Sequence, residues 1–351
     1  MTSSDVTREG VRNARPGREA VVGSGAAPVA GAPAQRRGRG GEQAMVPDAE
    51  FRSYYGLPVL NQPSWKSPDI PGYLFCGGLA GASSVLAAGA SLTGRGATAQ
   101  RLKVGAVAAL GVGVVGLVHD LGRPARFINM LRVCKPTSPM SVGSWLLAAY
   151  GPAAGTAAAC AVTGRLPAVG AAATVGAAVI GPAIASYTGA LVANTAIPAW
   201  HDGHREMPWV FVGSAATAAG GLGLLVGPTA ENGPARRLAM LGAAVELLAA
   251  KRMEQSAGAL VAEPYKTGRG GAYMRAGEVL TVAGIALGAV AGRRRRVAAA
   301  VGGTALMAAS ACTRWGIFHA GLASASDPRV TIEPQRRRLE RRAQASPSEL
   351  S

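Results

Sequence analysis

The chain has 351 residues, of which 49% are hydrophobic and 16% are charged, and its mean hydropathy is +0.21. Because both ends are very polar, the apolar residues are concentrated in the middle, as in membrane proteins. The net charge of +17 does not indicate a nucleic-acid partner, since the arginines fall in short connections and tails beside apolar runs, where they can meet anionic lipid headgroups. The four cysteines are scattered without C-x-x-C spacing, so we expect no metal, haem or iron-sulfur cluster bound by this chain.

The two ends of the chain are predicted to be disordered. Residues 1–50 are rich in Gly, Ala, Pro and Arg and have almost no large apolar side chains, so they cannot bury enough surface to fold. They also contain no apolar segment of a cleavable signal peptide, which leaves membrane insertion to the first hydrophobic helix. Residues 51–70 form a Pro-rich, aromatic segment suited to the membrane interface or to a partner surface, and residues 323–351 form a basic polar tail.

Uncharged apolar runs fill most of residues 71–322 and predict a bundle of transmembrane helices. A spanning helix needs about 20 apolar residues, which some runs reach outright and others only with polar residues at their ends. The runs are 70–92, 104–118, 140–163, 166–200, 209–230, 238–250, 279–292 and 297–313. We therefore expect an all-α, polytopic membrane domain with about eight spans.

Glycines and prolines inside these runs indicate how the predicted helices pack. Glycines four residues apart let two helix backbones approach closely in lipid, so we expect one compact bundle. Such glycines occur at 77/81, 151/155, 223/227 and 284/288/292. Pro152 and Pro182 lie inside two of the runs and are candidate positions for kinks.

The segment from His119 to Trp145 carries the densest chemistry of the chain and is predicted to be a loop between two spans. Gly122 can adopt the left-handed conformation that ends a helix, and Ser138 followed by Pro139 is typical of a helix start. Between them, cationic and apolar residues alternate in an amphipathic segment that we expect to lie on the membrane surface. The cationic residues are Arg123, Arg126, Arg132 and Lys135.

The same segment resembles a known family. The string D-L-G-R-P-x-R-F-x-N-M-L-R-V-x-K-P-T-S-P-M-S-x-G-S-W, from Asp120 to Trp145, is similar to the NrfD/polysulfide-reductase membrane subunits, as are shorter motifs elsewhere. These motifs lie at residues 54–56, 65, 77–81, 187–189 and 194–200, so the resemblance covers roughly residues 54–319. It implies an integral membrane subunit that exchanges electrons between a menaquinone-like quinone and a ferredoxin-like iron-sulfur subunit. That partner in turn serves a molybdopterin-type catalytic subunit.

Counting the predicted spans places the longer loops and all four histidines on one face of the membrane, which we call the elaborated face. The longer segments are 119–139, 194–208, 251–275 and the chain end with His319, whereas 93–103, 164–167, 227–237 and 292–296 are short connections on the opposite face. Lys and Arg near helix ends are more numerous on the elaborated face, which favours a cytoplasmic location for it. Two observations favour the opposite orientation, with the elaborated face outside the cytoplasm. One is the four arginines at 293–296 on the other face, and the other is the resemblance, which implies catalytic subunits outside the cytoplasm.

Quinol oxidation needs an apolar slot for the ring, hydrogen-bond partners for its two oxygens, and a titratable group that leads protons to water. His119 and Asp120 are the candidate catalytic pair at a helix end, and Arg123 is a candidate for binding the quinone. The alternative for Asp120 is an ion pair with Arg123 or Arg126 that holds the loop in place.

Polar groups inside the apolar runs supply further candidates, because an unsatisfied polar group in lipid is costly. Tyr187 and Asn194 are seven residues apart, hence on one helix face, and are candidates for binding a quinone oxygen; interhelical hydrogen bonds are the alternative. Glu246 is a candidate proton relay or quinol base. Its alternative is a position near the interface, paired with Lys251 or Arg252.

The remaining basic residues of the elaborated face are predicted to dock the iron-sulfur partner. They are Arg126, Arg132, Lys135, His201, His204 and Arg205. His201 and His204 indicate a metal site only weakly, because no further ligands accompany them. A haem bound by His119 and His319 is less strongly indicated, because haem histidines usually lie well inside facing helices.

The apolar runs predict a multi-pass protein in the cell membrane that contacts lipid and no nucleic acid, and the resemblance implies a subunit of an oxidoreductase that contacts quinone and its partner subunits. Two alternatives come from other classes of protein. One is a transporter or proton-conducting module whose pathway is lined by Asp120, Glu246 and Tyr187. The other is a purely structural anchor for an oxidoreductase.

Overall fold

The computed structural model describes residues 6–7, 10–11, 59–123 and 126–345, and its contacts divide the chain into two compact units. One unit comprises residues 63–323 and contains the helices predicted to cross the membrane. The other comprises residues 1–62 and 324–351. Each unit is described by itself, and the predicted disorder of residues 1–50 falls almost entirely outside the described residues.

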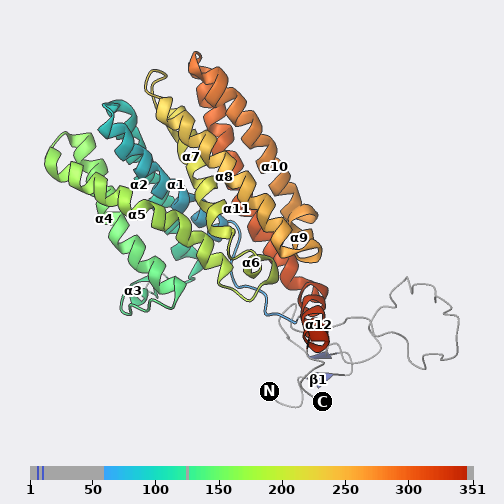
Figure 1. The fold of residues 1–351 in the computed structure, drawn as a ribbon. Helices are drawn as coiled ribbons and strands as arrows, with labels where there is room; N and C mark the ends of the chain where they lie inside the picture. Colours follow the sequence, from blue (N-terminus) through green and yellow to red (C-terminus); the bar gives the residue numbers. More distant parts are fainter. Residues whose placement is uncertain (1–5, 8–9, 12–58, 124–125, 346–351) are drawn as a thin grey trace, which may run out of the picture. The chain divides into compact units, whose positions relative to one another are not determined.

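The larger unit is built of helices, as the apolar runs predict (Figure 1). Their bounds are α1 (Asp69–Leu92), α2 (Gly96–Asp120), α3 (Arg126–Met130), α4 (Pro139–Thr163), α5 (Pro167–Ala193), α6 (Pro198–His201), α7 (Met207–Val226), α8 (Gly233–Ala257), α9 (Ala259–Lys266), α10 (Gly268–Gly284), η3 (Ile285–Val290), η4 (Ala291–Arg293) and α11 (Arg296–Ser326). The elements η3 and η4 continue α10 as a π-helical and a 3-10 segment.

Within the described residues, seven of these helices are long and apolar enough to cross a membrane. They are α1, α2, α4, α5, α7, α10 with its continuation to Arg293, and α11. The eighth predicted span, 238–250, lies inside α8, which has 25 residues but carries Arg236 and Arg237 near its start and further charges toward its end. The all-α, multi-pass prediction is confirmed, whereas α8 is long enough to span but not apolar enough to qualify by composition.

The helices α1 and α7 form the centre of the bundle. In each of them 72% of the most apolar 18-residue window is buried, compared with 17% in α2 and 28% in α4. α1 contacts α2, α5 and α7, and α7 contacts α8 along its length. Figure 1 shows α4 and α5 side by side at one edge of the unit, with α10 at the other.

Glycines allow the closest helix approaches, as the four-residue spacing predicts. A Cβ on Gly81 in α1 would collide with the Gly181 carbonyl in α5, and a Cβ on Gly288 would lie 3.1 Å from the Gly302 carbonyl carbon in α11. Gly155 is an exception, since a Cβ there would meet nothing within 4 Å. Pro152 and Pro182 lie inside α4 and α5, as predicted.

The described residues of the smaller unit form a two-stranded hairpin and the helix α12. β1 (Val6–Thr7) pairs antiparallel with β2 (Gly10–Val11). α12 (Pro328–Ala345) forms where we expected a disordered tail. Its sequence explains the difference, because Pro328 suits the first helical position and Arg, Leu, Glu and Gln are good helix formers.

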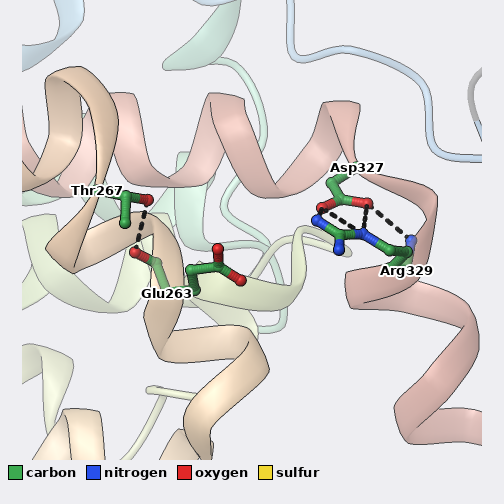
Figure 2. Close-up of polar contacts among 4 residues, drawn as sticks. All are labelled: Glu263, Thr267, Asp327 and Arg329. Carbon is green, nitrogen blue, oxygen red and sulfur yellow. Dashed lines mark hydrogen bonds and ion pairs between the residues drawn. The ribbon is translucent and has the colours of Figure 1, made fainter. Parts of the chain in front are cut away.

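Local side-chain contacts mark the ends of two helices, one in each unit (Figure 2). At the start of α12, the Arg329 guanidinium pairs with Asp327 Oδ2 at 2.8 Å, and the Arg329 backbone N–H donates to Oδ1 at 2.9 Å. These bonds lower the pKa of Asp327. At the end of α9, Thr267 Oγ1 donates to the Glu263 carbonyl at 3.0 Å.

Candidate functional site

The loop after α2 is held against the first turns of α4. Ser141 Oγ donates to the Val133 carbonyl at 2.9 Å and accepts the Lys135 backbone N–H at 2.9 Å. The Trp145 indole N–H donates to the same Val133 carbonyl at 3.3 Å. Both predicted helix ends are confirmed, since α4 begins directly after Ser138 and Gly122 has a φ of +67°. The loop is therefore fixed next to the ends of the surrounding spans.

A pocket of about 570 Å³, counting the space that opens to solvent, lies beneath this loop. We call it the loop pocket. Most of its lining is apolar, from α1, α2, α3, α4 and α5. The apolar residues include Ile70, Leu117, Phe127, Met130, Leu147 and Leu191. Its polar groups come from Asp120, Tyr187, Tyr73, Ser144 and Trp65. Two of the predicted site residues, Asp120 and Tyr187, are thus brought together although they are far apart in sequence.

Asp120 lies at the end of α2, where the Lys66 backbone N–H donates to its Oδ1 at 3.0 Å. This bond ties the segment before α1 to the pocket wall. Among the described side chains, Asp120 forms no ion pair, so the alternative of pairing with Arg123 is not seen, and the side chain of Arg126 lies outside the described part. The carboxylate is therefore held by a neutral donor while it lines an apolar pocket.

His119 is not among the residues that line the loop pocket. Its Nδ1 lies 2.7 Å from Asp69 Oδ2, and its side chain is 74% exposed. The carboxylate next to this histidine is thus Asp69 at the start of α1, and not its sequence neighbour Asp120. This contact joins the ends of two spans on the elaborated face.

Tyr187 reaches the pocket from α5, and the absence of a side chain at Gly143 in α4 makes room for it. A Cβ on Gly143 would collide with the Tyr187 phenol ring at Cζ, Oη and Cε1. Asn194, which the sequence placed on the same helix face, is exposed and does not line the pocket. α5 ends at Ala193, and Asn194 leaves helical geometry with φ −85° and ψ 47°. The chain then continues into the four-residue helix α6, which begins at Pro198.

Aromatic residues support the pocket wall that Trp65 forms. The Trp65 and Trp200 rings are stacked with centroids 5.5 Å apart. Trp200 is fully buried, and its indole N–H donates to the Ile317 carbonyl of α11 at 2.7 Å. Packing between α6 and α11 therefore positions a residue of the loop pocket.

A second buried polar cluster lies between α7, α8 and α11. Glu246 is only 4% exposed, and its Oε1 accepts the Thr313 hydroxyl at 2.7 Å. Arg314 is fully buried, donates to the Phe211 carbonyl at 2.8 Å and lies 4.0 Å above the Phe211 ring. Glu246 is thus deep in the bundle and does not pair with Lys251 or Arg252, which are exposed. It does not line the loop pocket.

Comparison with known protein families assigns the part of the chain that contains the loop pocket. Residues 59–232 match the family described as "Polysulphide reductase, NrfD". The chain belongs to this family. No curated protein matches the NrfD-family chain described here. Together with the seven candidate spans, the family makes it a multi-pass membrane protein and indicates a membrane subunit of a redox complex.

Every residue of the loop pocket falls inside the matched part of the NrfD-family chain, because the lining runs from Trp65 to Leu191. Glu246, Thr313 and Arg314 lie beyond its end at residue 232. The loop pocket therefore lies within the part of the chain that matches the family, whereas these three residues of the second cluster lie outside it.

The predicted docking residues of the NrfD-family chain lie on its elaborated face. Those with exposed side chains are Arg132, Lys135, His201, His204 and Arg205, and Arg123 is exposed as well and does not line the pocket. The imidazole rings of His201 and His204 have centroids 5.8 Å apart. Within the described residues, no group of three or more His, Cys, Asp or Glu side chains could hold a metal ion.

Several residues around the pocket and the second cluster were not predicted. Tyr73 and Ser144 line the loop pocket, yet they look like ordinary members of apolar runs. Arg314 was overlooked because the apolar run 297–313 stops just before it, whereas α11 continues to Ser326. A charged residue followed by another apolar stretch, here 315–318, is the signal that could have revealed it.

Proposed function

We propose that this NrfD-family chain is the quinone-interacting membrane subunit of a multi-subunit oxidoreductase in the cell membrane. It relays electrons between the membrane quinone pool and a ferredoxin-like iron-sulfur subunit of a molybdopterin-type enzyme. The observation that carries the proposal is the meeting of Asp120 and Tyr187 in one apolar pocket, within the part of the chain that matches the family.

The lining of the loop pocket suits the headgroup of a quinol substrate. Apolar side chains can surround the ring and the start of an isoprenoid tail, while the Tyr187 hydroxyl and the Asp120 carboxylate are hydrogen-bond partners for ring oxygens. Among the described residues, Asp120 is the one with a charged side chain that lines the pocket.

In this proposal Asp120 is the group that accepts a proton when quinol is oxidised. A carboxylate can take a proton from a substrate hydroxyl within hydrogen-bond reach, and Asp120 is partly exposed at the membrane face, so the proton can continue to water. Tyr187 orients the substrate, and the Lys66 backbone N–H holds the Asp120 carboxylate in place. The electrons leave on the elaborated face, where Arg132, Lys135 and Arg205 offer positive charge for docking the iron-sulfur partner.

The test is quinol oxidation by the complex purified with its native partners. Asp120→Asn should lower the rate by about 100-fold or more, the usual contribution of a general base. Tyr187→Phe should lower it roughly tenfold, through the loss of one hydrogen bond. The matched controls are Glu278→Gln, an exposed carboxylate on α10, and Tyr273→Phe, which lies outside the pocket. Assembly is checked by co-purification of the partner subunits.

Unchanged quinol oxidation in both Asp120→Asn and Tyr187→Phe would overturn the proposal and leave a purely structural anchor. A transporter lined by Asp120, Glu246 and Tyr187 has less support, because Glu246 is absent from the pocket that the other two share. Purification without any iron-sulfur or molybdenum-containing partner would favour that alternative.

A further inference from the structure

The face opposite the loop pocket is strongly basic. In the four short connections there, at 93–103, 164–167, 227–237 and 292–296, the described residues include ten Lys or Arg side chains and one acidic residue, Glu231. The Glu231 carboxylate already accepts the Thr98 backbone N–H at 2.8 Å. This membrane face therefore presents a large excess of positive charge where lipid headgroups lie.

A groove opens on this basic face between the end of α1 and the start of α8. It holds about 930 Å³ of space, a figure that includes space open to the surroundings. Its floor is aliphatic, with Val85, Leu86, Leu238 and Leu241. Leu241 is 64% exposed and Val85 38%, so these side chains are presented to lipid and not covered by another helix of the chain.

Two guanidinium groups lie at the polar end of the groove. Arg95 and Arg237 both line it, beside Thr93. Arg237 is exposed and forms no hydrogen bond or ion pair with the described residues, and Arg95 donates only to the Thr93 carbonyl, at 3.3 Å. Both guanidinium groups can therefore donate further hydrogen bonds to a phosphate.

The groove also has room for an acyl chain at its centre. Gly89 lines it, and a Cβ on Gly89 would meet no atom within 4 Å. The arrangement is an apolar channel that follows the helices and ends in a pair of cations at the level of the headgroups. Basic pockets between helices at a membrane face are the usual binding sites of anionic phospholipids.

We propose that this groove is a binding site for an anionic phospholipid, with the phosphate between Arg95 and Arg237 and an acyl chain along Gly89 and Leu241. The site is independent of the quinol pocket, because it lies at the other face of the membrane. A lipid at this position would fill the groove that α1 and α8 line.

The test measures lipid retained by the full chain in mild detergent, using native mass spectrometry with phosphatidylglycerol and phosphatidylcholine of the same acyl chains. Wild type should retain phosphatidylglycerol preferentially. Each Arg near the headgroups contributes roughly fivefold to binding, so Arg95→Gln with Arg237→Gln should reduce this preference about 30-fold. Arg165→Gln is the matched control, because Arg165 lies on the same face outside the groove.

A second variant tests the acyl chain separately. Gly89→Leu should fill the groove and reduce the binding of both lipids, whereas Gly111→Leu should not, because Gly111 is a helical glycine with equally open surroundings outside the groove. Quinol oxidation reports whether each variant still folds. The proposal is overturned if the preference survives the double substitution, if Arg165→Gln removes as much of it, or if inorganic phosphate displaces the lipid.

Discussion

Replacing Gly143 by alanine tests whether the position of Tyr187 matters for the proposed chemistry. Gly143 lies in the first part of α4, directly beneath the Tyr187 ring, and its backbone is helical. The substitution adds one methyl group and changes neither charge nor hydrogen-bonding capacity. Any effect must therefore come from the contact between this methyl group and the phenol ring.

The size of the effect follows from the contact. The added Cβ would collide with three atoms of Tyr187, so the ring must move by roughly 1.5 Å before carbon atoms are separated by the usual ~3.5 Å. Overpacking of this kind costs about 1–3 kcal/mol if the ring stays in place. If the ring moves instead, its hydroxyl leaves the substrate, and a misplacement of about 1 Å can lower a rate about 100-fold.

The assay is quinol oxidation by the assembled complex, with thermal unfolding measured on the same samples. Gly143→Ala should lower the rate of quinol oxidation at least tenfold, which corresponds to roughly one lost hydrogen bond. If the ring stays in place instead, the substitution should lower the unfolding temperature. Gly155→Ala is the matched control, because it lies in the same helix and its Cβ would meet no atom within 4 Å. Wild-type activity and stability in Gly143→Ala would refute both the packing of Tyr187 and its proposed role.

Two other carboxylates give further predictions, one on quinol oxidation and one on thermal stability. Glu246→Gln should keep most of the quinol oxidation that Asp120→Asn loses, because Glu246 does not line the loop pocket; a comparable loss in both variants would restore the sequence-based role of Glu246 as a quinol base. Glu231→Gln should lower the unfolding temperature at about pH 7, because the hydrogen bond from the Thr98 backbone N–H lowers the pKa of Glu231 in the folded protein. That stabilisation is present above the unfolded-state pKa of about 4.3 and disappears as the pH falls through the folded-state pKa. An equal difference in unfolding temperature between wild type and Glu231→Gln at about pH 3 would therefore contradict the prediction.

The positions of most helices could be predicted from the sequence because lipid imposes a simple rule. Each span must satisfy its own backbone hydrogen bonds and present apolar side chains over about 20 residues. α1 begins one residue before the predicted run at 70–92, and α4 begins one residue before the run at 140–163. The prediction that Asn194 lies on one helix face with Tyr187 was wrong. An apolar run does not show where a helix ends when another short helix follows within a few residues.

The residues of the candidate site could be predicted only as separate candidates. Asp120 and Tyr187 stand out by type and position, yet no local pattern indicates that they share a pocket. The contact of His119 with Asp69 and that of Glu246 with Thr313 are equally hidden, since each joins residues at least fifty positions apart.

The sequence by itself determined the membrane class, the approximate spans, the helix ends around the loop and the family. These properties depend on local conformation and on transfer into lipid, both of which a short stretch of residues encodes. Only the tertiary structure decided which polar groups meet, because glycine contacts such as Gly81 with Gly181 set the distance between helices. The packing of α1, α2, α4 and α5 thus puts Asp120 and Tyr187 in the loop pocket and leaves Glu246 elsewhere.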